Sequence, residues 1–395
     1  MTATNSSARK AKSTAAKGKR RDVVAEKAKT ERTKLAFVVP SFDGTGTESE
    51  AFAAAVVHEL AARGYELLVI SNNGASADDH VTVCKRTPLH LGRKSIKTFA
   101  PKAIVDWGYN MPAEFRRVGS PYEQIVKHSL QNHGGLGRLL KALKLRFSSH
   151  HRHHVHREKA LMGVSQTVFL ASSEGVAADL ENAGVQRQRI QVLPYGVDLN
   201  RFKPAPLREQ RTAVRREQRF AESDVVFLCM TDTEYHLDMD CLHDAFAKAR
   251  EDHPNIRLLL AGEDCPKWSE PWVARASSEM SAAKLLAGSD ALLHPAFYDP
   301  GSPMPIQAMA AGIPVITTEA VGEAKFVRDS GSALFAPIQT EGAAEAWTQA
   351  VVQLADSEDT RKRLGECGRT AAEQRGLARF VDQLERTLDT KPTTE

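Results

Sequence analysis

Short apolar runs alternate with helical patterns along most of this chain. The run LAFVVPSF predicts a buried strand, and Phe52, Val56 and Leu60 then recur at helical spacing. Thr47 and Glu50 have the spacing of a capping box, which places the start of that helix. The next run, YELLVIS, predicts a second strand. Strand, helix and strand in this order favour a mainly parallel sheet with helices on its faces.

The same rhythm weakens, returns and then starts again. VTVCKRT and KAIVDW predict weaker strands, and residues 111–162 are polar and basic, with poorly periodic helical stretches. TVFLASS, a helix over Glu174–Asn182 and RIQVLPYGVDLNRF restore the alternation. A second cluster of strands runs through DVVFLCM, IRLLLAG, DALLH and IPVITT. We therefore predict an α/β protein of two Rossmann-like domains, with a ligand cleft between them at the carboxyl ends of the strands.

Length and charge set the domain boundaries. A chain of 395 residues with 42% apolar content is long enough for two cores. We assign residues 34–200 to the first domain and residues 201–376 to the second. Eleven Lys or Arg but only three acids fall within residues 1–34, where Ala, Ser, Thr and Lys dominate. This composition predicts a disordered basic tail over residues 1–33, which is either solvated or binds nucleic acid or an anionic membrane.

Composition also excludes several classes of protein. No run approaches the ~20 consecutive apolar residues of a membrane-spanning helix, and the N-terminus lacks the apolar core of a signal peptide. We therefore expect a cytoplasmic protein. The five cysteines form no CxxC pair, which argues against a disulfide framework or a zinc site.

The segment SSHHRHHVHREK is rich in histidine, and His150 and His154 are four residues apart. Neither Cys nor an acid completes a tetrahedral set of ligands nearby, so we predict no metal site here. The segment belongs instead to a predicted basic surface, which would meet a phosphorylated or membrane-bound glycolipid, or only solvent. The members of that surface are Arg116, Arg117, Lys144, Arg146, Arg152 and Arg157.

Candidate chemistry concentrates in His294–Thr318, HPAFYDPGSPMPIQAMAAGIPVITT. The pattern predicts a loop after a strand, a helix that begins at Pro303 or Pro305 and ends before Gly312, and then another strand. The N-terminus of such a helix offers unpaired N–H groups and a partial positive charge, which suit a diphosphate. A nucleotide ligand is therefore expected at this end of the helix.

This segment closely resembles the donor-binding segment of the family 4 (group 1) glycosyltransferases of GT-B type. The resemblance runs from about Lys34 to the C-terminus, and it also rests on DGTGTE, VFLASS, RIQVLPYGVDLNRF, LLLAG and VGEAKFVRDSG in that order. LLHPA, DWGYNMP and the basic segment 146–159 look nearest to the lipopolysaccharide core glucosyltransferase I group. The resemblance implies that the helix predicted at Leu377–Leu388 crosses back to the first domain.

The resemblance also implies retaining hexosyl transfer from a nucleotide-diphosphate sugar to an acceptor hydroxyl, with no metal and no other cofactor. The family has one acid that holds the sugar hydroxyls and a second that binds the ribose, and Asp299 and Gln307 stand at these positions. We expect Asp299 to be catalytic and Gln307 to bind the donor through its amide oxygen. Gly301 and Ser302 stand where amides would face the phosphates, but Pro303 has no N–H to donate. For Asp299 the alternative is that it only forms an ordinary Asp-Pro-Gly turn. For Gln307 the alternative is that it is a helix residue that contacts no ligand.

One departure from the family concerns the phosphate-binding Arg and Lys, which should lie near His236 and Leu237. Neither basic residue is present. Loss of one preorganised donor typically costs on the order of 3 kcal/mol of transition-state stabilisation. We expect protonated His236 to restore a part of this as a donor-binding residue.

In the first domain, Gly44, Thr45 and Gly46 form a loop after the first strand, where the backbone can approach a ligand in the cleft. Asn110 resembles a cleft-facing position that contacts the acceptor. The neighbouring Tyr109 is equally consistent with simple packing.

Three functions remain in view at this point. The main hypothesis is a retaining glycosyltransferase that acts on a cell-envelope saccharide or glycolipid, either in the cytoplasm or peripherally at the inner face of the cytoplasmic membrane. The second is a catalytically impaired relative that binds a sugar nucleotide or a glycan, or serves as a partner subunit. The third is salt-sensitive nucleic-acid binding through the basic tail. The main hypothesis names a nucleotide sugar and a saccharide or glycolipid acceptor as partners, and no specific nucleic acid.

Overall fold

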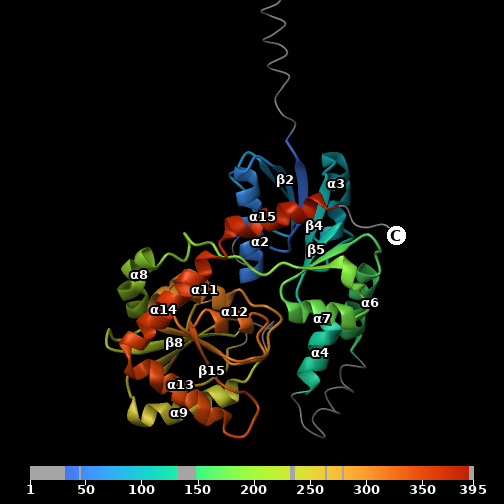
Figure 1. The fold of residues 1–395 in the computed structure, drawn as a ribbon. Helices are drawn as coiled ribbons and strands as arrows, with labels where there is room; N and C mark the ends of the chain where they lie inside the picture. The colour runs from blue at the N-terminus through green and yellow to red at the C-terminus, as the bar shows by residue number, and fades with distance from the viewer. Residues whose placement is uncertain are drawn as a thin grey trace, which may run out of the picture.

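The computed structural model describes residues 32–43, 46–131, 148–231, 236–262, 265–277 and 280–390. Two parallel sheets within these ranges form two α/β domains (Figure 1). The predicted α/β class with two Rossmann-like domains is confirmed. Gly44, Thr45, Lys144 and Arg146 lie outside the described residues, as does the basic tail up to residue 31.

The described first domain is built on a seven-stranded sheet with the order β3-β2-β1-β4-β5-β6-β7. Every neighbouring pair of these strands is parallel. The strands are β1 (Lys34–Val38), β2 (Glu66–Ser71), β3 (Val81–Lys85), β4 (Ala103–Trp107), β5 (Phe115–Val118), β6 (Val168–Ala171) and β7 (Ile190–Val192). The helical elements are α2 (Glu48–Ala62), η1 (Leu89–Gly92), α3 (Arg93–Phe99), α4 (Tyr122–Gln131), α6 (Ser149–Met162), α7 (Glu174–Asn182) and η2 (Arg187–Arg189).

The described second domain has a six-stranded parallel sheet with the order β11-β10-β8-β12-β14-β15, and a small antiparallel pair, β9 and β13. The strands are β8 (Val225–Met230), β9 (His236–Leu237), β10 (Ile256–Ala261), β11 (Val273–Arg275), β12 (Ala291–His294), β13 (Ala296–Tyr298), β14 (Val315–Thr317) and β15 (Ala333–Phe335). The helices are α8 (Pro204–Glu217), α9 (Met239–Asp252), α10 (Ala282–Gly288), α11 (Met304–Ala310), α12 (Ala324–Asp329), α13 (Ala343–Asp356) and α14 (Glu358–Glu373). The last helix of the chain, α15 (Leu377–Asp389), follows them.

Helix α2 begins where the capping-box spacing predicts. The Thr47 hydroxyl accepts a hydrogen bond from the Glu50 amide at 3.3 Å, and the Glu50 carboxylate accepts one from the Thr47 amide at 2.8 Å. Two N–H groups that the helix leaves unpaired are thereby satisfied. Phe52, Val56 and Leu60 bury the inner face of the helix against the sheet. The start of α2 is therefore held in a fixed position near the carboxyl end of β1.

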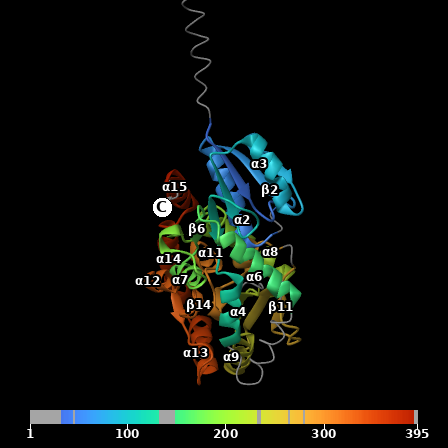
Figure 2. The same ribbon diagram turned by 90° about the vertical axis from the view of Figure 1, so that its right-hand side faces the viewer.

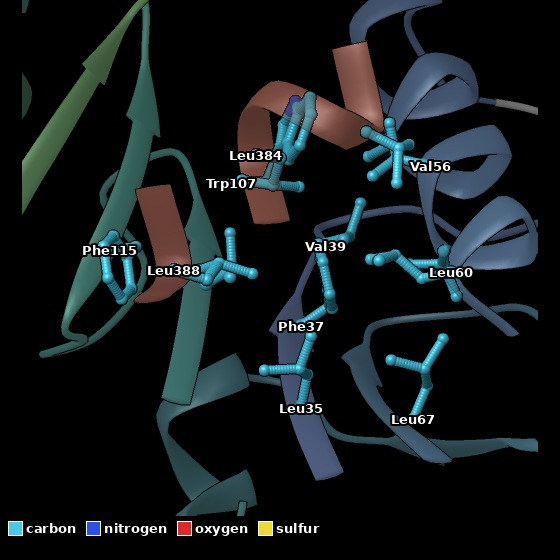
Figure 3. Packing of buried hydrophobic residues seen from close by; sticks show 14 of the residues in the cluster. Leu35, Phe37, Val39, Val56, Leu60, Leu67, Trp107, Phe115, Leu384 and Leu388 are labelled. Atoms are coloured by element: carbon cyan, nitrogen blue, oxygen red, sulfur yellow. The ribbon is translucent and has the colours of Figure 1, made fainter. Parts of the chain in front are cut away.

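Helix α15 belongs to the first domain in space, although it ends the chain. Figures 1 and 2 both place it beside the first-domain sheet. Its apolar face, which includes Leu384 and Leu388, joins the core formed by β1, β4 and α2 (Figure 3). At the rim, Arg63 at the end of α2 donates to Asp382 at 2.6 Å and to Glu385 at 2.7 Å. The last helix thus closes one face of the first sheet.

Strand β5 is one of the strands that the sequence pattern did not predict, together with β9, β11, β13 and β15. Residues 115–118 lie inside the stretch that we expected to be polar and basic, yet all four residues are buried. Arg116 is 0% exposed and Arg117 is 2% exposed. The prediction that both residues lie on a basic surface is therefore wrong. Two adjacent arginines hide the apolar pattern of a strand this short. In the fold, Arg116 pairs with Asp106, and Arg117 contacts backbone carbonyls and aromatic rings.

The packing of α15 yields a test of stability. Replacement of Leu384 by Ala should lower the free energy of unfolding by about 2–5 kcal/mol, because it leaves a cavity in the first-domain core. Chemical denaturation followed by circular dichroism measures this loss. Arg386→Ala, an exposed change on the same helix, is the matched control. Equal stabilities of the two variants would show that α15 does not complete this core.

Candidate functional site in the cleft between the domains

A cavity of about 400 Å³ lies between the two domains. The first domain lines it with the start of α2, the carboxyl ends of β4 and β5 and part of α6, and the second domain lines it with the loop 299–303. The strands of a parallel sheet end at the same edge, so the cavity lies where α/β proteins commonly bind ligands. Side chains at this cavity include Ser49, Trp107, Asn110, Arg117, Arg157, Glu158, Tyr195 and Asp299.

A larger hollow of about 890 Å³ lies between α8 and α14, away from these strand ends. Several charged side chains there are already paired. Arg211 contacts Asp290, and Lys362 contacts Glu358 at 2.7 Å. We therefore place the candidate site in the interdomain cavity, where loops of both domains meet.

Asp299 follows β13 and is 2% exposed. Its Oδ1 accepts hydrogen bonds from the amides of Gly301 at 2.8 Å and Ser302 at 2.7 Å. Its Oδ2 lies 2.8 Å from Nε2 of the buried His294. Both carboxylate oxygens therefore hold the loop that lines the cavity. A direct hydrogen bond from a sugar hydroxyl to this carboxylate would have to add to these contacts or displace one of them.

The start of α11 has fewer free donors than its sequence suggested. The amides of Gly301 and Ser302 are bound to Asp299, and the Met304 amide donates to the Ser302 hydroxyl at 3.1 Å. Pro303 and Pro305 have no N–H. A phosphate at this end would therefore meet few unpaired amides in the conformation seen. Gly301 has φ +133°, and a Cβ there would lie 2.9 Å from the Ser172 hydroxyl, so only glycine fits.

Gln307 points from α11 to the first domain. Its Nε2 donates to Glu48 Oε2 at 2.9 Å, while its Oε1 is buried and has no hydrogen-bond partner within the described residues. Glu48 also pairs with Arg201 at 3.2 Å. The amide that replaces the family's second acid thus serves a contact between the domains. A glutamate at position 307 would bring two carboxylates together.

The loop 298–303 is also fixed to the first domain by neutral groups. The Tyr298 hydroxyl donates to Asp179 on α7 at 2.6 Å, and the hydroxyls of Ser172 and Ser173 donate to the Pro300 carbonyl at 3.0 Å and 2.9 Å. Burial and the nearby Asp179 carboxylate raise the pKa of Tyr298. Tyr298 therefore stays a neutral donor at physiological pH, and the two domains meet tightly at this edge of the cavity.

Asn110 lines the cavity, but its side chain also stabilises the turn after β4. Its backbone N–H and its Nδ2 each donate to the Asp106 carboxylate at 2.9 Å. Asp106 forms a fully buried pair with Arg116. Burial raises the pKa of Asp106 to about 6, against the lowering effect of Arg116. Asn110 is therefore held rigidly where it faces the cavity, next to the partly buried Tyr109.

The remaining predicted residues are less fully described. His236 lies in β9, opposite Tyr298 in β13, but only its backbone is described. Leu237 packs into an apolar cluster with Ala296 and Val321. Gly46 precedes α2, whereas Gly44 and Thr45 lie outside the described residues.

Sequence reasoning missed Arg117 and Glu158 as cavity residues. Glu158 on α6 accepts a hydrogen bond from the Tyr122 amide at 2.7 Å, and burial raises its pKa to about 7. Both residues lie in the stretch with poor periodicity, so no local pattern separated them from solvated charges. For Arg117 the available signal was its position just after DWGYNMP, which was already placed at the cleft, whereas Glu158 lies far along the chain from that segment.

The described residues contain neither a cluster of metal ligands nor a membrane-spanning helix. No group of three His, Cys, Asp or Glu in those ranges is arranged to hold a metal ion. No helix found there is both long and apolar enough to span a membrane.

Comparison with known proteins relates most of the second domain to one family. The model of the family "Glycosyl transferases group 1" matches residues 210–371. Lipopolysaccharide glucosyltransferase WaaG of Escherichia coli (strain K12) is 25% identical over 239 residues, which make up 56% of this chain and 64% of WaaG. The chain thus matches less than two thirds of the length of that relative.

Solved structures extend the likeness to both domains. The crystal structure of WaaG has a TM-score of 0.70 at 19% identity, with 90% of this chain and 99% of that chain covered. HepE of Anabaena, crystallised in complex with UDP and glucose, has a TM-score of 0.65 at 15% identity, with 91% and 100% covered. These likenesses confirm the predicted GT-B fold. The second domain is therefore similar to the group 1 glycosyltransferases, 56% of the chain is similar to WaaG in sequence, and 90% of the chain resembles WaaG in fold.

Proposed function

We propose that this protein is a retaining glycosyltransferase that moves a hexosyl group from a nucleotide sugar to a cell-envelope saccharide or glycolipid. The observation that carries the proposal is the cavity between the domains, which the carboxyl ends of the first sheet and the loop 299–303 line. The group 1 match and the WaaG likeness support sugar transfer, and the HepE complex supports a nucleotide donor. We keep a cytoplasmic location, with or without contact at the membrane surface, as part of the proposal.

The chemistry requires opposite charges on the two sides of one bond. As the glycosidic bond breaks, negative charge grows on the diphosphate and positive charge grows on the sugar. We assign donor binding to the loop 299–303, with Asp299 at the sugar, and acceptor binding to the first-domain wall at Asn110 and Glu158. We assign no metal to this reaction.

Asp299 acts in this proposal first by holding the loop. Its charge fixes the amides of Gly301 and Ser302 and orients His294, so the loop has one defined shape before the donor arrives. Preorganised groups need little rearrangement when charge develops in the transition state. The same negative charge would also stabilise the positive charge that grows on the sugar.

A specific observation favours a second candidate, a sugar-nucleotide binder without turnover. The Gln307 amide already donates a hydrogen bond to Glu48, and Leu237 packs among apolar side chains where the family has a basic residue. The changes at positions 307 and 237 both remove groups that would bind the donor. Binding alone needs weaker stabilisation than catalysis, so this candidate predicts donor affinity without transfer.

The first prediction separates these candidates. A panel of nucleotide sugars should raise the melting temperature of the protein, and at least one should be consumed with an acceptor saccharide. Asp299→Asn should lower kcat on the order of a hundredfold, because the loop loses its charged anchor. Asp329→Asn, an exposed acid in the same domain, is the control. No melting shift at millimolar ligand excludes both candidates, and a shift without consumption leaves the binder.

The second prediction concerns the Gln307–Glu48 contact. Gln307→Glu should lower the free energy of unfolding by about 2 kcal/mol, because a charge-assisted hydrogen bond becomes a repulsion between carboxylates. The double variant Gln307→Glu with Glu48→Gln restores one donor and one acceptor and should recover most of this loss. A double-mutant cycle in urea measures the coupling. Strictly additive losses would contradict the assigned contact.

The third prediction follows from the raised pKa of Glu158. An unfolded Glu ionises near pH 4.3, whereas folded Glu158 keeps its proton up to about pH 7. Between these values the folded state binds more protons, so the Glu158 contribution to stability falls as pH rises. Glu158→Gln removes this contribution, and its stability relative to the original protein should therefore rise from pH 4.5 to 7 and then level off.

Melting temperatures measured in one buffer series test the third prediction. Asp106 is present in both proteins, so its own titration cancels in the difference. Glu174→Gln changes a carboxylate that is 80% exposed and serves as the control with a flat difference. A flat difference for Glu158→Gln as well would mean that Glu158 titrates normally.

A further inference from the structure

The two arginines of β5 point to opposite faces of the first sheet and have different surroundings. Arg116 pairs with Asp106 and also donates to the carbonyls of Gly108 and Met111 at 2.7 Å. Arg117 has no ion pair within the described residues. Its Nη1 donates to the Leu193 carbonyl and, at 3.3 Å, to that of Leu170, while its Nε and Nη2 have no hydrogen-bond partner in the same ranges. One guanidinium is therefore neutralised and the other is not.

A buried cation without a counter-charge is costly for a folded protein. Arg117 is 2% exposed, and burial lowers its pKa, although Tyr195 and Glu323 act in the opposite direction. Three aromatic rings surround the guanidinium, with the Tyr195 centroid at 4.4 Å, Phe380 at 5.8 Å and Trp107 at 5.9 Å. These rings offset part of the cost through cation–π attraction. They do not supply the two acceptors that Nε and Nη2 lack.

The position of Arg117 suggests what those acceptors are. Arg117 lines the interdomain cavity together with the loop 299–303 of the second domain. Arg157 lines the same cavity and donates to the Asn110 carbonyl at 3.1 Å, so a second guanidinium lies near the rim. The Nε and Nη edge of a guanidinium matches two oxygens of a phosphate in a bidentate hydrogen bond. The second domain offers little alternative, since the amides of its loop are already bound.

We infer that Arg117 binds a phosphate group of the cavity ligand, so that the first domain supplies a cation where the described second-domain lining, residues 299–303, has none. Two ligands could provide this phosphate, and both would be recognised by the same hydrogen bonds. It belongs either to the diphosphate of the donor or to a phosphorylated acceptor. Only this choice of source rests on the proposed function, because the anion site itself requires no transfer.

The test compares Arg117→Met with Arg189→Met. Met keeps an unbranched chain of similar reach and removes the charge. Arg189 is a matched control because it is in the first domain, donates only to the carbonyls of Met162, Val164 and Thr167, and lies 5.3 Å from the Phe169 ring. Binding of inorganic pyrophosphate, UDP, ADP and glucose 6-phosphate is measured by calorimetry, and ligand-free melting temperatures are measured beside it.

The inference predicts that Arg117→Met weakens binding of at least one of these anions tenfold or more. It also predicts that the melting temperature falls less in Arg117→Met than in Arg189→Met. Arg189→Met should lose stability and keep its anion affinity. Loss of pyrophosphate and nucleotide binding identifies the donor as the source, and selective loss of glucose 6-phosphate binding identifies the acceptor. Arg117→Lys should recover part of the affinity, since it restores the charge without the bidentate geometry.

Two outcomes overturn the inference. One is an Arg117→Met protein that loses as much stability as Arg189→Met and binds every probe as before, which would make Arg117 purely structural. The other is an original protein that binds none of the four probes. Failure of the proposed function is distinguishable, because Arg117-dependent pyrophosphate binding without any sugar transfer would support the anion site and reject the transferase.

Discussion

The chain passes between its domains twice, and the two passages are bound to each other. The Val197 amide donates to the Arg375 carbonyl and the Leu377 amide donates to the Val197 carbonyl, both at 2.9 Å. A Cβ on Gly196 would lie 2.9 Å from Phe380, so the passages can approach this closely only with glycine there. Because α15 then completes the first-domain core, that core contains residues from both ends of the described chain. The cavity lies at the junction that these passages define.

Within that junction, charge is divided unevenly between the two domains. The second domain contributes Asp299, whose two carboxylate oxygens already contact its own loop and His294. The first domain contributes Arg117, whose guanidinium lacks an acid partner among the described residues. A ligand that bridges the domains would meet a loop held by the Asp299 carboxylate on one side and a cation without an acid partner among the described residues on the other. This division differs from the arrangement that the family resemblance implies.

The departures from the family pattern are also linked to one another. Gln307 looked like the loss of an acid, but its amide donates to Glu48 across the domain boundary, and Arg201 holds Glu48 from the linker. An acid at position 307 would repel Glu48. The substitution is therefore consistent with a closed interface between the domains, and it cannot be interpreted from α11 alone. The structure likewise turns Asp299 from an isolated catalytic candidate into the organiser of a loop.

The sequence by itself determined the fold class and many of the elements. Helix α7 has the predicted bounds, α2 begins at its capping box, and α15 follows its apolar stripe, because hydrogen bonds and periodicity within a few residues decide these features. Tertiary structure alone decided β5, the burial of Arg116 and Arg117, and the contact of Gln307 with a residue 259 positions away. A buried charge is tolerable only with the partners that the fold brings to it, and those partners leave no periodic trace beside it in the sequence.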